Sequence, residues 1–475
     1  MIPEIAWKNV WRNKSRSLIV ITAVTIGVFA GVFTIAVMNS SVVQSIDAAV
    51  NEELSHIQVN NKEFRSSSDI KSLIPAYDKV VAEMMKAPGM QDLTGRIIIR
   101  GIASTAGRST GVEINGINAA KEKQIFTLHE KLIPGTGDFL DTETKYNKAF
   151  IGEKLARELN IIRYSITEES LKKLKDEKLP GEISTKLIAL KGERFTSDKK
   201  FSRAVEAVLL PGEYRKYIYL IKEAAWSYRP GSKIILSFID INNNQTEAAF
   251  RVSGIFRTNN DMFEAMSVFV PEEELRQLTG IPENSYHRVI GRLKDNSLSE
   301  AASAYLKKEL PGYEVMQWKE IQPDLAMLAD MMQQIYGIFM GIILAALSFG
   351  IVNTMLMSVL ERTREIGMLS AIGMNRNRIF SMIMLESVFL SLTGGLSGML
   401  VSGIVIAATA KNGINLVEYS EGLEAFGYSA YLFPTIDAPF FIMTTILIVF
   451  TGILSSVYPA RKALKLNPIE ALRKE

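Results

Sequence analysis

The 475-residue sequence contains no cysteine and only three histidines, and these shortages exclude several kinds of site. Without cysteine there is no disulfide scaffold, no cysteine zinc site and no thiol nucleophile. His56, His129 and His287 lie far apart in the sequence, which argues against a histidine metal site or a Ser-His-Asp triad. The net charge of +3 is too small to indicate nucleic-acid binding. We therefore expect no metal, no catalytic residues and no nucleic-acid partner.

A phosphate-binding loop is missing as well. The sequence has no G-x-x-x-x-G-K-[ST] pattern, which in a Walker A loop places backbone amides around the phosphates of a nucleotide. We expect that this chain is not an enzyme and holds no cofactor of its own, so that any energy it uses is supplied by another protein.

Long apolar runs, in contrast, are abundant. Four of them occupy residues 17–46, 331–360, 379–410 and 438–460. The only charged residue in any of these runs is Glu386, in the third. A hydrocarbon core of about 30 Å requires about 20 helical residues, so each run is long enough to cross a bilayer. Four separate runs of this length are not typical of a soluble protein, and we predict four transmembrane helices.

The charges between these runs predict the orientation. Residues 1–16, 361–378 and 461–475 each carry four or five Lys and Arg, whereas the loop 411–437 carries only Lys411. By the positive-inside rule the first three segments are cytoplasmic, and residues 47–330 lie outside. The first run is longer than the 7–15 apolar residues usual in a cleaved signal peptide, which favours an uncleaved signal anchor. The expected location is the inner, cytoplasmic membrane.

The segments outside the bilayer divide into three kinds. Residues 1–16 form an amphipathic interfacial helix, with Trp7 and Trp11 suited to the headgroup region. Residues 47–330 show strand and helix patterns in turn, which predicts a large mixed α+β domain. Within it, residues 162–228 are rich in Lys and Glu and contain two Pro-Gly turns, so we expect an insertion there. The predicted strands are 56–59, 96–102, 112–117, 233–238, 249–256 and 267–270, and the predicted helices are 76–86, 152–159, 170–178, 271–278 and 298–309.

Small residues recur inside the predicted spans. Three spans carry glycines four residues apart on one helix face, a spacing that allows close helix packing, although glycine is also common in membrane helices without such a role. These glycines are Gly27, Gly31, Gly337, Gly341, Gly394 and Gly398. Glu386 lies in the inner half of the bilayer. We expect it to form a hydrogen bond between helices rather than a proton relay, because the spans contain no other ionisable residue.

Three segments on the cytoplasmic side resemble the permeases of the MacB/LolC/LolE/FtsX family. Residues 360–374 read LERTREIGMLSAIGM, similar to the family signature E-R-x-R-E-I-G-x-L-x-A-I-G. Residues 6–16, AWKNVWRNKSR, resemble the family's opening motif, and YPARKA at 458–463 with NPIEALR at 467–473 resembles its closing motif. In the outer domain, SHIQV at 55–59, IGEKLA at 151–156 and GIF at 254–256 also look familial.

The resemblance implies a permease that works as a dimer with a separate cytoplasmic ATPase, which would bind ATP and Mg²⁺. The outer domain would be of the Porter and Sabre type, and residues 361–378 would be the coupling helix that docks on the ATPase. Ile366, Leu369 and Ile372 would give that helix an apolar edge. The residues assigned to coupling are Glu361, Arg362, Arg364, Glu365, Ile366, Gly367, Leu369, Ile372 and Gly373.

The resemblance leaves the client open. Release of lipoproteins, as by LolC/LolE, is the first expectation, because four spans and a large outer domain fit that layout. Export of peptides or toxic small molecules, as by MacB, and FtsX-like signalling to a cell-wall hydrolase are the alternatives, and a membrane-anchored enzyme is a remote one. Besides the ATPase, the expected partners are a second permease chain, membrane lipid, and a lipoprotein or a periplasmic adaptor.

Overall fold

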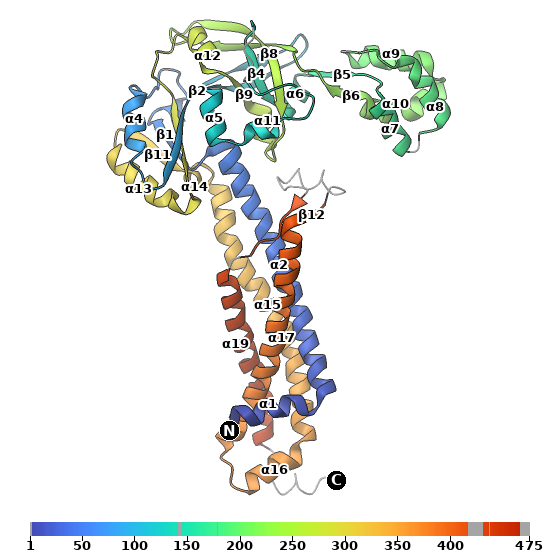
Figure 1. Ribbon diagram of the computed structural model, residues 1–475, viewed down its shortest axis with the longest axis vertical. Helices are drawn as coiled ribbons and strands as arrows, with labels where there is room; N and C mark the ends of the chain where they lie inside the picture. The colour runs from blue at the N-terminus through green and yellow to red at the C-terminus, as the bar shows by residue number, and fades with distance from the viewer. Residues whose placement is uncertain (1, 141–144, 178, 417–430, 437, 466–475) are drawn as a thin grey trace. The chain divides into compact units, whose positions relative to one another are not determined.

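The computed structural model describes residues 2–140, 145–177, 179–416, 431–436 and 438–465. It divides the chain into two compact units, each with its own hydrophobic core. The first unit combines Met1–Ile46 with Asp324–Glu475, and the second is Asp47–Pro323. We describe the two units separately (Figure 1).

The first unit is helical. Four of its helices are long and apolar enough to cross a membrane, as the apolar runs predicted. Its helices are α1 (Ile2–Arg12), α2 (Lys14–Ala48), α15 (Pro323–Glu361), α16 (Thr363–Ala371), α17 (Arg376–Asn412) and α19 (Ala438–Leu464), and a short two-stranded sheet joins β12 (Ile414–Asn415) to β13 (Tyr431–Leu432).

Apolar side chains occur both inside and outside this bundle. Val28, Met340 and Ile448 are completely or almost completely buried between helices. Ile338 and Phe349, on the same helix as Met340, are more than half exposed. A helix that is apolar on every face is stable in lipid, which solvates the outer side chains, while the helix itself satisfies its backbone hydrogen bonds.

The second unit is mixed α and β, as expected from the alternation of patterns. Its strands are β1 (Ile57–Asn61), β2 (Met90–Ser104), β3 (Ser109–Ile117), β4 (Lys148–Gly152), β5 (Ile162–Tyr164), β6 (Trp226–Tyr228), β7 (Lys233–Ile239), β8 (Gln245–Phe256), β9 (Ser267–Pro271), β10 (Arg288–Leu293) and β11 (Tyr313–Gln317). Its α-helices are α3 (Phe64–Ser67), α4 (Tyr77–Met84), α5 (Ala119–Ile125), α6 (Glu153–Glu158), α7 (Glu168–Asp176), α8 (Gly181–Leu187), α9 (Asp198–Val208), α10 (Pro211–Ala225), α11 (Asp261–Met266), α12 (Glu272–Thr279), α13 (Ser299–Glu309) and α14 (Trp318–Ile321). A π-helical segment, η1 (Ala49–Leu54), continues α2 into this unit, and three short 3-10 segments are η2 (Leu128–Lys131), η3 (Ile188–Leu190) and η4 (Asn296–Leu298).

The long strand β2 belongs to two sheets at once. Its first half pairs with β10 in a four-stranded sheet of order β11-β1-β10-β2. Its second half pairs with β3 on one side and with β7 on the other, so the hydrogen-bonded ring β2-β3-β9-β4-β8-β7 closes on itself. We call this ring the barrel. A closed ring leaves no unpaired edge strand.

Each sheet has its own core. Inside the barrel, Ile97, Ile114 and Phe250 are inaccessible to solvent. On the four-stranded sheet, Val59 packs with Leu306 of α13 and with side chains of α4. Alternate residues of a strand point to opposite faces, so the same strand supplies side chains both to a core and to the surface.

Residues 162–228 form a separate helical lobe. The two-stranded pair β5–β6 is its stem, with Ile162 opposite Tyr228, and α7 to α10 are packed around their own core, which includes Leu174, Phe201 and Ile221. Only the first of these helices was predicted from the sequence. The other three were missed because their Lys and Glu residues obscured the apolar periodicity on which the prediction depended.

Some boundaries differ from the predictions. Helix α15 begins at Pro323, within the segment 47–330 assigned to the outer domain, because Asp324 and Asp330 interrupt the apolar run but not the helix. Helix α16 is shorter than the predicted 361–378, since Gly373, with φ of +94°, ends it and Asn375 begins the next helix. The closing motif 467–473 and most of the loop 411–437 lie outside the described residues.

Candidate functional site

Helix α16 connects two long helices and is held by ion pairs at its beginning. The Arg362 guanidinium donates to both carboxylate oxygens of Glu386 on α17, at 3.1 Å each, and its Nε donates to Glu365 at 3.1 Å. Arg12 of α1 also contacts Glu365, with N–O distances of 2.6 and 2.8 Å. Arg16 of α2 pairs with Glu361 at the end of α15. We call this set the ion-pair network.

The network is buried at its centre and exposed at its edge. The side chains of Arg362 and Glu386 are 15% and 6% exposed, whereas those of Arg12 and Glu365 are 53% and 44% exposed. The hydrogen bond from Arg12 lowers the pKa of Glu365, which therefore remains ionised at neutral pH. Glu386 is therefore bonded to a residue outside its own helix, the cation Arg362. No sequence pattern indicated this pair, because Arg362 lies outside the span and 24 residues away.

Helix α1 lies against the same end of α17. Ala6 and Val10 are buried, and the Trp7 ring packs edge-on against Phe389 with centroids 5.5 Å apart. Ser17 at the start of α2 donates to the Val10 carbonyl. Helix α1 is therefore held to α17 by apolar packing and to α16 by the ion pair of Arg12 with Glu365.

The apolar edge predicted for the coupling helix does not exist as one surface. Ile366 is 4% exposed and belongs to the core of the bundle, and Leu369 is partly buried against that core. Ile372 is 79% exposed, and Met368, which we had not singled out, is 53% exposed. The spacing of three residues between these apolar side chains did not reveal that one face of α16 packs on its own bundle. The exposed side chains Arg364, Met368 and Ile372 are four residues apart and share the opposite face.

The remaining residues assigned to coupling divide in the same way. Glu361 and Glu365 are held in the ion-pair network, Gly367 is buried, and Gly373 is exposed. Their role in contact with an ATPase remains a prediction.

Two of the glycine pairs lie at close helix contacts. A Cβ atom added to Gly394 would lie 2.9 Å from the Ile21 carbonyl oxygen, and one added to Gly398 would lie 2.7 Å from that of Thr25. The backbones of α17 and α2 are therefore in contact, and the Thr25 hydroxyl donates to the Gly394 carbonyl at 3.1 Å. At Gly27 and Gly31 an added Cβ would instead meet the side chains of α15, including Leu347 at 2.7 Å.

The third pair behaves differently. A Cβ atom added to Gly337 or Gly341 would lie more than 4 Å from every described heavy atom other than the adjacent residues and the nearby backbone of its own helix. Among the described residues this pair makes no helix contact, and a packing role against a second chain remains a prediction. The spacing of glycines gives the face on which they lie, but it does not give the direction in which that face points.

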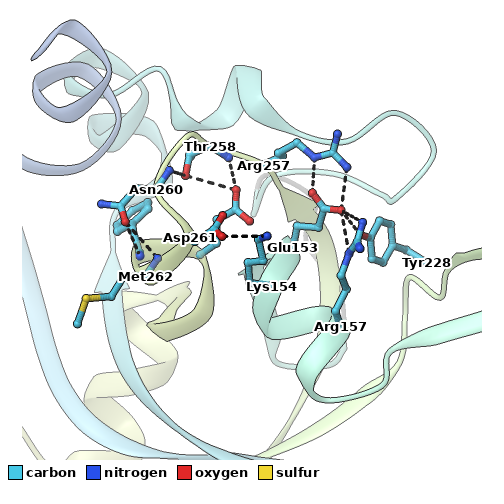
Figure 2. Close-up of polar contacts among 11 residues, drawn as sticks. Glu153, Lys154, Arg157, Tyr228, Arg257, Thr258, Asn260, Asp261 and Met262 are labelled. Carbon is cyan, nitrogen blue, oxygen red and sulfur yellow. Dashed lines mark hydrogen bonds and ion pairs between the residues drawn. The ribbon is translucent and has the colours of Figure 1, made fainter. Parts of the chain in front are cut away.

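A second polar network lies in the α/β unit and was missed from the sequence. Figure 2 shows Glu153, at the start of α6, accepting hydrogen bonds from Arg157, Tyr228 and Arg257. Burial alone would raise the pKa of Glu153, but these three donors outweigh it and lower the pKa to about 2. The carboxylate thereby joins α6, the end of β8 and the stem of the lobe. Its only signal in the sequence was its place in the familial IGEKLA segment.

The same region connects to η1, which continues α2. Asn260 donates to Glu53 at 2.9 Å, and Lys154 pairs with Asp261 at 3.0 Å. The buried Glu264 carboxylate accepts a hydrogen bond from the Thr258 amide. Burial raises the pKa of Glu264 to about 7. These contacts fix the segment that follows β8 against α6 and η1.

Among the residues with described coordinates, no three His, Asp or Glu side chains are grouped closely enough to hold a metal ion.

Comparison with known proteins places the bundle in context. Residues 337–468 match the family model described as FtsX-like permease C-terminal. Residues totalling 34% of the chain are 34% identical to the ABC transporter permease YknZ of Bacillus subtilis and cover 37% of it. A similar share is 36% identical to the macrolide export ATP-binding/permease protein MacB of Chlorobium luteolum and covers 22% of it. A permease of Methanocaldococcus jannaschii is 29% identical and 55% covered.

Among solved structures, the periplasmic region of MacB from Actinobacillus actinomycetemcomitans aligns at 12% identity with a TM-score of 0.29, covering 60% of this chain and 98% of that one. The chain spans between about a fifth and just over half of the length of the three curated relatives described. The matched segment 337–468 includes α16, α17 and α19 and most of α15. The chain therefore contains an FtsX-like permease domain and has homologues among the ABC transporter permeases of the MacB and YknZ type.

Proposed function

We propose that this chain is the permease subunit of an ABC transporter, and that a separate cytoplasmic ATPase docks on α16. The observation that carries the proposal is the two-faced structure of α16. One face is fixed to the bundle by Ile366 and the ion-pair network, and the other exposes Met368 and Ile372. Two large apolar side chains on a short charged helix, outside the apolar part of the spans, are typical of a protein contact.

The same proposal assigns ATP and Mg²⁺ to the partner, because the sequence of this chain has no Walker A pattern. It also places the α/β unit outside the cytoplasm, since the basic segments surround α1 and α16. The chain would then be inactive as an ATPase when purified alone. Steady ATP turnover by the isolated chain, with contaminants excluded, would contradict this assignment.

The docking test uses substitutions on the two faces of α16. Ile372→Asp would place a carboxylate in the contact, and burying an unpaired charge costs several kcal/mol, which weakens binding by about a hundredfold or more. Binding is measured with a cytoplasmic ABC ATPase from the same organism, by co-purification from detergent and by ATP turnover in the reconstituted complex. Ile188→Asp, at a 51% exposed position in the lobe, is the matched control.

Two outcomes separate docking from folding. We expect Ile372→Asp to lose the ATPase while the melting temperature of the chain is unchanged, whereas Ile366→Asp should lower the melting temperature itself. If Ile372→Asp and Ile188→Asp bind the ATPase equally well, α16 is only a connection between two spans and the proposed coupling is wrong.

The client of the transporter is the finer part of the proposal. The relatives described above are named as MacB and as permeases of unstated cargo, which favours MacB-like export over the lipoprotein release expected from the layout. A cavity of about 490 Å³ supports an amphipathic client, because it is lined mainly by apolar side chains of α2, α15 and α19 and also contains Asn39 and Tyr336. The Tyr336 hydroxyl is buried with no hydrogen-bond partner among the described residues.

Stimulation of ATP turnover distinguishes these clients. In the reconstituted complex, we compare a macrolide with a synthetic triacylated lipopeptide, and repeat the comparison with Met443→Trp, which fills the cavity. Stimulation by one of the two that the substitution abolishes identifies the class of client. No response to either would favour the FtsX-like alternative, in which the α/β unit transmits a signal and nothing is exported.

A further inference from the structure

A second cavity, of about 510 Å³, lies in the α/β unit beside the base of the lobe. It is formed where the β2–β3 turn, the end of α6 and the turn between β6 and β7 meet. The residues that matter for its chemistry are Arg108, Asn160, Thr196, Arg229, Lys233 and Arg251.

The charge of this cavity is strongly positive. Four of the side chains that line it are cationic, and no Asp or Glu is among its described lining residues. Elsewhere in the unit, cations of the polar networks are matched by carboxylates, as Arg96 is by Glu122 and Lys131 by Glu52. Like charges gathered around one space repel one another, and an anion in that space would relieve the repulsion.

The cations are also available for binding. Arg229 and Lys233 form no ion pair with a described residue, and Arg108 uses one N–H on the Glu158 carbonyl at 3.3 Å. The Arg251 guanidinium lies 4.3 Å above the Tyr146 ring. Stacking restricts the guanidinium plane and leaves its in-plane N–H groups directed outward, where they can donate to an oxyanion.

We propose that this cavity binds a multiply charged anion that bears phosphate groups. Arginine forks donate two parallel hydrogen bonds to a phosphate, and lysine adds a point charge. Four cations favour more than one negative charge, and the volume exceeds that of a single phosphate ion. The anion is either a soluble phosphate compound or the phosphorylated headgroup of a lipid. Because Thr196 belongs to the lobe and Arg108 to the barrel, the bound anion would contact both.

The test measures binding to the full chain in nanodiscs of phosphatidylcholine by isothermal titration calorimetry. Inorganic pyrophosphate is the probe for a soluble ligand, and water-soluble dihexanoyl phosphatidic acid is the probe for a lipid headgroup. We expect one of them to bind at one site per chain. Tighter binding of pyrophosphate assigns the site to a soluble compound, and tighter binding of the short-chain lipid assigns it to a headgroup.

Paired substitutions show whether the cavity is the site. Arg229→Gln combined with Lys233→Gln should weaken binding at least about tenfold. Arg215→Gln combined with Lys216→Gln removes the same two charges from α10, outside the cavity, and should change the affinity by less than about twofold. All residues replaced are exposed, and the melting temperature of each variant checks the fold. Equal weakening by both pairs, or no binding of either probe to the native chain, would overturn the proposal.

Discussion

Arg362 is the residue on which three helices depend. It directs one edge of its guanidinium to Glu386 on α17 and another to Glu365 on α16, and Glu365 is shared with Arg12 of α1. A carboxylate buried among apolar helices is costly unless a cation pairs with it at good geometry. The pair therefore fixes how the short helix meets the bundle, even if it adds little net stability by itself.

We expect Arg362→Ala to destabilise the bundle by about 3–5 kcal/mol, because it leaves the Glu386 carboxylate buried without a partner. The double variant Arg362→Leu with Glu386→Leu should cost less than Arg362→Ala, since neither charge is then left alone. Arg12→Ala, at the exposed end of the network, should cost about 1 kcal/mol or less. Thermal unfolding in detergent, followed by intrinsic fluorescence, gives all three values. A double variant less stable than Arg362→Ala would contradict this account.

Glu264 allows a prediction about pH. Its pKa is raised from the ordinary 4.5 to about 7, so the folded state binds the proton more tightly than the unfolded chain does. Ionisation therefore costs stability progressively as the pH rises from about 4.5 to about 7, and the cost is complete above that range. We expect Glu264→Gln to raise the melting temperature at pH above about 8, by the equivalent of about 1–3 kcal/mol, and to have little effect at pH about 4.

The control for this experiment is Glu283→Gln, at an exposed position, which should leave the melting temperature unchanged at every pH. Glu264→Gln keeps an oxygen for the Thr258 amide, so a loss of that hydrogen bond does not confuse the result. A stabilisation of the same size at acid and alkaline pH would show that burial of the charge is not its cause.

At the scale of helices, the three glycine pairs look alike in the sequence but differ in what lies against them in the structure. Gly394→Ala would push a methyl group toward the Ile21 carbonyl oxygen, and overpacking of this kind costs about 1–3 kcal/mol. Gly337→Ala and Gly341→Ala meet open space and should be neutral or stabilising by up to about 1 kcal/mol, since alanine favours the helix.

Thermal unfolding and size-exclusion chromatography test the two sets together. A lower melting temperature for Gly337→Ala would show that this pair has a packing role inside the chain. A change confined to the oligomeric state would instead place the pair against another copy or another protein.

The elements that could be predicted are those whose signal is local. Twenty or more apolar residues specify a span, and alternation specified strands such as β3 and β7, because both patterns are visible in a single segment. The orientation of a face depends on what is packed against it. Ile366 and Ile372 have similar surroundings in the sequence, yet one is buried and the other exposed. Glu153 and Tyr228 are hydrogen-bonded at the stem of the lobe although they lie 75 residues apart in the sequence. No local sequence pattern could therefore predict their contact.

At the scale of the whole molecule, the lobe is the part most easily removed. Its core is separate from that of the barrel, and Tyr164 lies directly opposite Trp226 in the stem. We expect that replacing residues 165–225 with a two-residue Asn-Gly turn closes the stem as a hairpin and leaves the rest of the chain folded. Transport or signalling should change, while the melting temperature should stay within a few degrees of the native value.

Circular dichroism and ATPase co-purification measure this outcome. A second variant adds Tyr228→Phe, which removes a donor to Glu153, and it should be less stable than the deletion alone. If the deletion itself unfolds the α/β unit or abolishes ATPase binding, the lobe belongs to the structural core.

The strands β1 and β11 have a mechanical consequence. Only Ser55 and His56 separate η1, the continuation of α2, from β1, and only α14 and Gln322 separate β11 from α15. These two strands are hydrogen-bonded neighbours, from Ile57 opposite Gln317 to Asn61 opposite Tyr313. The segments that connect these two helices to β1 and β11 are therefore very short. If β1 slides along β11, the ladder is loaded in shear, the direction in which all of its hydrogen bonds resist together.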